Sequence, residues 1–152
     1  MSIVKPITIT TAVGLLVSLG CTPPPPPIPA RRPDVTIKAS FNKTWEAALA
    51  VFAERNIPVN KDRLSGTIAS DLRDVLSKEG GAKQCGTNKA GEIVFANFVK
   101  YRIMVKGDSA SSTLHAAAVF IRSMGASITE CPSAGTWEEG FEADVKQRAE
   151  QS

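Results

Sequence analysis

The residues of this 152-residue chain that most readily do chemistry are three cysteines and one histidine. Cysteine thiols accept lipids, pair as disulfides, bind metals or act as nucleophiles, and their spacing distinguishes these uses. Cys21 directly follows an apolar run, whereas Cys85 and Cys131 stand apart in the second half of the chain. No Cys-x-x-Cys pair and no cluster of ligand residues occurs, so the sequence predicts no metal site.

No catalytic constellation emerges from the remaining polar residues. His115 falls on the polar side of a strand pattern, and we predict a surface or edge residue rather than a catalytic base. Asp71 with Asp74, or Glu138 with Glu139, could form carboxylate pairs, but we interpret them as solvated charges. Phosphate-loop and dinucleotide motifs are absent. The sequence therefore predicts no catalytic residue, no cofactor and no enzyme. An enzyme that uses Ser, Asp and Lys groups is an alternative that ranks below the two binding functions described at the end of this section.

The N-terminus has the features of an export signal. One cation, Lys5, precedes an apolar stretch from Ile7 to Leu19, and the small residue Gly20 stands before Cys21. A transmembrane anchor is the alternative, but about a dozen apolar residues fall short of the ~20 that span a bilayer. We expect residues 1–20 to be a signal peptide.

The stretch Ser18-Leu19-Gly20-Cys21 resembles the lipobox of bacterial lipoproteins, with Ser18 and Leu19 in swapped order. The resemblance implies cleavage before Cys21 and attachment of diacylglycerol and further acyl chains, such as palmitate, to this residue. It also implies a partner, the membrane, and Thr22 in place of an aspartate suggests the periplasmic side of the outer membrane. An ordinary free thiol beside a secretory signal is the alternative reading of Cys21.

Residues 21–33 form a proline-rich linker, with prolines at 23–27, 29 and 33. Such a segment favours polyproline II at ~3.1 Å per residue, so the linker could hold a domain about 35 Å from a lipid surface. A PxxP ligand for an aromatic groove is the alternative. The net charge of +3, without a Lys/Arg stripe interleaved with aromatics, argues against nucleic acid as a partner.

Residues 34–152 alternate between strand and helix patterns. We expect a strand at Val35–Ala39, then an amphipathic helix at Lys43–Arg55 with Asn42 as its N-cap. Val59 and Gly66–Ser70 should then form a bent strand or two short strands around Lys61–Arg63. Asp71–Glu92 reads as a long excursion with at most one short helix.

The strongest strand signals form a long hairpin. Ile93–Lys106 places apolar residues at odd positions and Lys100, Arg102 and Lys106 on the other face, and Thr113–Arg122 returns beside it. After a Gly/Ser/Pro loop, a helix is expected at Thr136–Gln151. The order β-α-β-β-β-α predicts an α+β fold, with two helices packed on an antiparallel sheet.

Setting Cys21 aside leaves an even number of cysteines, as expected for an exported protein. We predict a Cys85–Cys131 disulfide; a redox-active role is the alternative.

The pattern from Phe41 to Ser70, a helix leading through Ile57-Pro58-Val59 to Gly66-Thr67-Ile68, is similar to small envelope lipoproteins. In element order it also resembles the helix-grip domains of the lipoprotein C subunit of the β-barrel assembly machinery. The resemblance implies a non-catalytic interaction or scaffold module with an envelope protein as partner. The alternative is binding of a small apolar ligand or lipid between sheet and helix.

Overall fold

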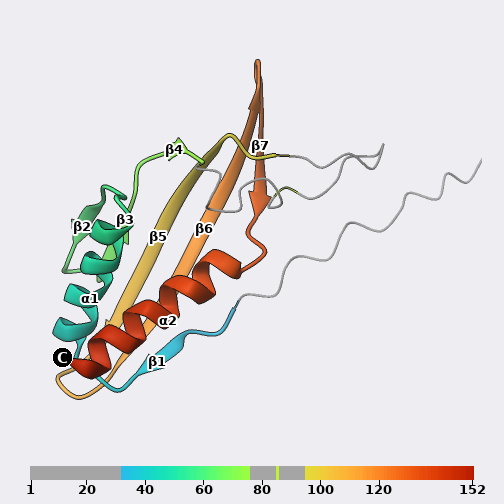
Figure 1. The fold of residues 1–152 in the computed structure, drawn as a ribbon. Helices are drawn as coiled ribbons and strands as arrows, with labels where there is room; N and C mark the ends of the chain where they lie inside the picture. The colour runs from blue at the N-terminus through green and yellow to red at the C-terminus, as the bar shows by residue number, and fades with distance from the viewer. Residues whose placement is uncertain (1–31, 76–84, 86–94) are drawn as a thin grey trace, which may run out of the picture.

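The computed structural model describes residues 32–75, 85 and 95–152 of the chain. Within them, two helices pack on one face of a seven-stranded antiparallel sheet, the predicted α+β fold (Figure 1). The sheet order is β1-β6-β5-β3-β2, with β4 added to β5 and β7 to β6. The signal peptide predicted at 1–20, Cys21 and most of the linker lie outside the described residues.

The predicted hairpin forms the centre of the sheet. Strands β5 (Phe98–Gly107) and β6 (Ser112–Met124) pair over ten residues, and buried and exposed side chains alternate along both. This period of two follows from the pleat and gives each strand one core face. The remaining strands are shorter: β1 (Val35–Ile37), β2 (Asn60–Asp62), β3 (Thr67–Ala69), β4 (Arg73–Asp74) and β7 (Ser127–Pro132).

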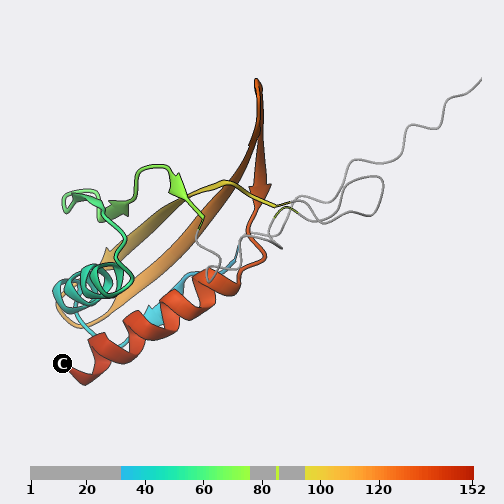
Figure 2. The same cartoon turned by 45° about the horizontal axis from the view of Figure 1, so that its top comes forward.

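Both helices lie on the same face of this sheet, as Figure 2 shows by looking along the two layers. Helix α2 spans Thr136–Gln151, as predicted. Helix α1 spans Phe41–Glu54 and begins two residues before the predicted start. Its N-cap is Ser40, whose hydroxyl accepts the N–H of Lys43 at 3.4 Å, and not Asn42.

Aromatic rings fill the layer between the helices and the sheet. Trp137 stacks on Tyr101 of β5 with ring centroids 4.0 Å apart, and on Phe141 at 5.0 Å. Phe52 of α1 completes the cluster, 4.7 Å from Phe141. All four rings are buried, so the core is closed by large side chains.

Four predictions are corrected by the structure. The excursion expected from Asp71 contains strand β4, which pairs with β5. The long strand begins at Phe98 rather than Ile93, because the segment Phe95–Asn97 is not in strand conformation; Ile93 itself lies outside the described residues. Val35–Ala39 is strand only to Ile37. The Gly/Ser/Pro loop expected before the last helix contains strand β7, which forms a second hairpin with β6. The sequence of β7 shows no apolar alternation. The segment is a strand because it pairs with β6, not because of its own pattern.

Candidate functional site

The face of the sheet opposite the helices carries the best candidate site. No helix of the described part of the chain lies on it (Figure 2). The outward residues of β5 and β6 stand in register as four pairs: Lys100 with Val119, Arg102 with Ala117, Met104 with His115, and Lys106 with Thr113. Side chains at alternate positions of one strand share a face, so three cations, Lys100, Arg102 and Lys106, form a row along β5.

A hollow lies beside this row of cations. Its volume is about 250 Å³, and it is lined by Arg102, Met104, His115 and Ala117. The hollow exists because Arg102 has small neighbours on both sides, Ala117 on β6 and Ala69 on β3. A larger side chain at Ala117, which lines the hollow, would fill part of it. We name the hollow and the cations beside it the open sheet face.

The charges of the open sheet face are only partly compensated. Lys100 approaches Glu130 of β7 at 3.7 Å, a pair whose side chains are both about half exposed. Such a pair contributes less than about 1 kcal/mol. Arg102 and Lys106 form no ion pair with any residue that the structure describes. A guanidinium and an ammonium without partners suit carboxylate or phosphate groups of a binding partner.

His115 lies on this face, opposite the apolar residues of β6, as predicted. Its Nδ1 atom is 3.1 Å from a carboxylate oxygen of Asp34, just before β1. This contact does not have hydrogen-bond geometry, and the other residues that line the hollow, Arg102, Met104 and Ala117, offer no nucleophile. Across residues 32–75, 85 and 95–152, no group of three or more potential metal ligands occurs.

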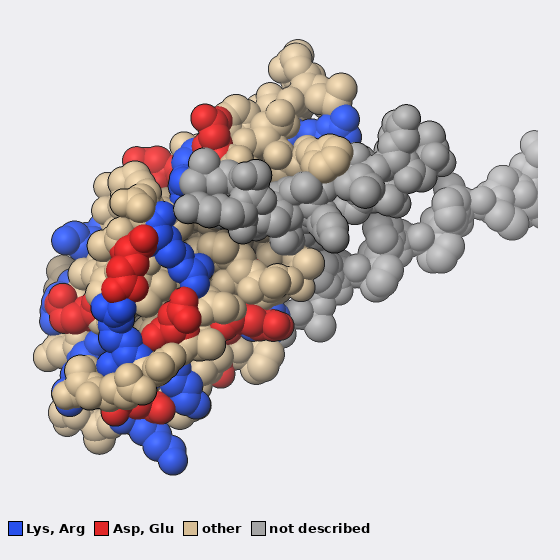
Figure 3. Space-filling view, in the orientation of Figure 1, with Lys and Arg blue, Asp and Glu red and all other residues tan. Residues whose placement is uncertain are grey.

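The helix side is a weaker candidate. Two grooves of about 490 and 450 Å³ flank Arg148 between α1 and α2. Two ion pairs join the helices here: Arg148 of α2 pairs with Glu54 of α1, and Arg55, next to the end of α1, pairs with Asp144 of α2 at 2.8 Å. Acidic and basic side chains are interspersed over both helices (Figure 3). Because these charges compensate one another within the domain, they leave little attraction for a charged partner.

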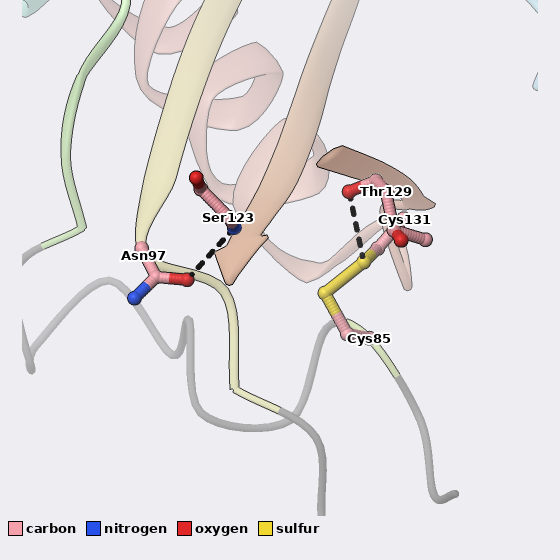
Figure 4. The surroundings of a disulfide bond; sticks show 5 residues. All are labelled: Cys85, Asn97, Ser123, Thr129 and Cys131. Carbon is pink, nitrogen blue, oxygen red and sulfur yellow. Dashed lines mark hydrogen bonds between the residues drawn. A yellow bond between two sulfur atoms is a disulfide. The ribbon is translucent and has the colours of Figure 1, made fainter. Parts of the chain in front are cut away.

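The two cysteines of the domain come together as the predicted pair. The sulfur atoms of Cys85 and Cys131 are 2.06 Å apart, a disulfide (Figure 4). Cys131 lies at the end of β7 rather than in the expected loop. Its sulfur is 3.9 Å from the carbonyl oxygen of Thr129, which is a contact only, since a bonded sulfur has no proton to donate. Asn97, next to this site, accepts the N–H of Ser123 through its side-chain oxygen.

One carboxylate of α2 is not where the sequence suggested, and a second had no prediction attached to it. Glu138 is 3% exposed and accepts the backbone N–H of Ala118 at 3.0 Å, so its interpretation as a solvated charge is wrong. Glu142 is equally buried and accepts the N–H of Ala116 at 3.0 Å. Its importance was missed, although its spacing of four from Glu138 places both on one helix face. Asp71 and Asp74 are exposed, as expected.

These glutamates occupy a gap in the sheet. Strands β1 and β7 both pair with the same edge of β6. Strand β1 pairs with it up to Leu114, and β7 pairs with it from Val119 onward, so the edge of β6 between these two residues has no strand partner. Buried backbone N–H groups need acceptors, and the two side chains supply them. Arg32 binds Glu142 at 2.9 Å and thereby fixes the end of the linker to α2.

No family model matches this chain, and none of the curated proteins matches it. Within the described residues, no helix is long and apolar enough to cross a membrane.

Proposed function

We propose that this protein is a membrane-anchored lipoprotein whose domain is a non-catalytic docking module of the bacterial cell envelope. The open sheet face is its binding surface, and the partner presents carboxylates or other anions to Arg102 and Lys106. One observation carries the proposal. Neither cation forms an ion pair with a described residue, and both lie beside a hollow on a sheet face that no described helix covers.

The anchor is Cys21, at the periplasmic side of the outer membrane. Support comes from the lipobox-like stretch before this residue and from the proline-rich linker after it. Several acyl chains on one residue hold a protein at a membrane far more firmly than a single chain does. Intact mass and membrane partitioning of the full chain beside its Cys21→Ser variant test this part. A lipid-sized mass gain, lost in the variant, is expected; an unmodified product would overturn the anchor.

The docking surface is tested separately by photo-crosslinking in the envelope. A photoreactive residue at Thr113, opposite Lys106 and outside the lining of the hollow, should give one discrete adduct, and the same residue at the exposed Ala53 of α1 should not. Adding Arg102→Glu should remove the adduct, because reversing the charge repels an anionic partner. Equal adducts at both positions, or an adduct that survives the charge reversal, would contradict the proposal.

An apolar ligand between sheet and helix is the alternative prediction, and no observation favours it. That layer is occupied by Trp137, Phe141, Tyr101 and Phe52, whose rings contact one another directly. Native mass spectrometry of the purified protein would reveal a retained lipid.

A further inference from the structure

The hairpin formed by β6 and β7 projects from the body of the domain, at the top of Figure 1. Its tip runs through Ser123–Thr129, seven consecutive residues without a charge. Met124 is 61% exposed and Ile128 72% exposed, although both are large apolar side chains. We name these seven residues the hairpin tip. Large apolar side chains held in water at a protruding position mark an interaction site.

The other exposed apolar residue at this end strengthens the pattern. Phe95 is 57% exposed, and two residues later Asn97 donates its N–H to the carbonyl of Ile121 at 2.9 Å. The segment of Phe95 therefore runs along the base of the hairpin. Of the five large apolar side chains that are exposed in the described residues, three lie here; the others are Leu64 and Leu72.

The linker reaches the domain at this same end. Arg32 binds Glu142, and its Cδ lies 3.6 Å from the position of a Cβ on Gly135, between β7 and α2. Strand β7 then leads away from this point to the hairpin tip over six residues, about 20 Å at the usual rise of a strand. The C-terminus lies at the opposite end of α2 (Figure 1).

We infer that the hairpin tip is a second membrane contact, which dips into the lipid surface beside the acylated Cys21. This inference rests on the lipid anchor proposed above. Ten linker residues, 22–31, reach about 31 Å as polyproline II, more than the 20 Å that separates the linker's end from the tip. The lipid and the tip can thus occupy one bilayer surface.

Two charged residues bound the tip, Arg122 and Glu130, and the carboxylate of Glu130 is compensated by Lys100 at 3.7 Å. Arg122 stands opposite Thr129, where the uncharged run begins, and forms no ion pair with a described residue. Figure 3 shows the uncharged tip with cationic side chains just behind it. Apolar side chains at the tip would contact the acyl chains, and a cation farther from the tip would lie at the level of the anionic headgroups. The contact orients the domain, with the C-terminal end of α2 and the β5–β6 turn farthest from the membrane.

The test places a tryptophan at the tip. The full lipidated chain carrying Ile128→Trp is reconstituted in vesicles of phosphatidylethanolamine and phosphatidylglycerol, with and without brominated acyl chains. Leu64→Trp, at a fully exposed apolar position elsewhere, is the matched control. The two native tryptophans are buried and give a constant background. We expect a blue shift and loss of the added emission for Ile128→Trp only, and recovery of that emission when Met124→Asp is added.

With the lipidated chain, each other result overturns the contact. No quenching at either position means that the lipid alone holds the protein, and equal quenching means that the domain has no fixed orientation. No quenching together with a dimer in light scattering would place a second copy on the tip. Intact mass reports the lipid independently: if it is absent, the anchor fails, and the variants are added to vesicles from solution. A blue shift of Ile128→Trp there would keep the tip contact, and its absence would reject it.

Discussion

The carboxylate of Glu142 accepts the backbone N–H of Ala116 at 3.0 Å, so that a helix side chain takes the place of a strand at the edge of β6. Glu138 does the same for Ala118 one helical turn earlier. The hydroxyl of Ser133 donates to Glu138 at 2.7 Å, and Arg32 donates to Glu142 at 2.9 Å. Each buried carboxylate is thereby held by two donors, as burial of a charge requires.

Removing this acceptor should weaken the fold markedly. Glu142→Ala leaves the Ala116 N–H and the Arg32 guanidinium without their partner, and we expect a loss of about 2–4 kcal/mol in the free energy of unfolding. Glu142→Gln keeps an acceptor oxygen and should cost less, about 1 kcal/mol. Urea unfolding measures both. Glu139→Ala, at a side chain 70% exposed, is the control and should change little. Equal stability of Glu142→Ala and Glu139→Ala would contradict the role of the gap.

The disulfide should be a major source of stability. Cys85 and Cys131 are 46 residues apart. Closing a loop of this length lowers the entropy of the unfolded chain and raises the free energy of unfolding by about 4 kcal/mol. The double variant Cys85→Ala/Cys131→Ala should lose an amount of this order in urea unfolding. Thiol titration of the denatured, unreduced exported protein should find neither cysteine free. Two reactive thiols would show that the pair is not formed in the cell.

Gly66 permits a close approach of two strands. It has φ +68°, and a Cβ there would lie 2.1 Å from the carbonyl oxygen of Val105. Gly66→Ala should therefore cost about 2–4 kcal/mol, from the left-handed backbone and the overlap together. Gly125 at the hairpin tip has φ +59° with open space around it, so Gly125→Ala should cost only about 1–2 kcal/mol. Thermal unfolding of both variants separates the two causes, and equal losses would exclude the overlap.

The β5–β6 turn should weaken in acid. The N–H groups of Ser111 and Ala110 donate to the carboxylate of Asp108 and hold its pKa below the ordinary value of 3.8. A group whose pKa is lowered by folding stabilises the fold above its unfolded pKa, and this stabilisation is lost as the pH falls through the folded pKa. NMR titration should find the pKa of Asp108 below 3.8.

Its control is Asp108→Asn, which keeps an acceptor but cannot ionise. Between about pH 5 and pH 2 this variant should lose less stability than the natural chain does. Parallel acid curves for the two proteins would show that the turn carboxylate contributes nothing to the pH dependence.

The sequence alone predicted the elements with strong periodicity. The four-residue spacing of Trp137, Phe141 and Val145 places α2, and the alternation along β5 and β6 places the central hairpin and the cations of the open face. Strand β7 and the N-cap of α1 were missed. Strand β7 has no apolar alternation that would predict it. Asn42 was predicted as the N-cap in place of Ser40, but its side-chain oxygen accepts a hydrogen bond from Arg63 at 2.8 Å.

Periodicity determined which side of each main element faces the core, because the repeat of a helix or strand is a local property of the backbone. It could not tell what a buried polar group binds. Arg32 and Glu142 are 110 residues apart, and Glu142 and Ala116 are 26 apart. Only the tertiary structure brought them together, since the gap between β1 and β7 exists only once both strands have docked on β6. The same docking buries two glutamates of α2, and it leaves one face of the sheet without a described helix.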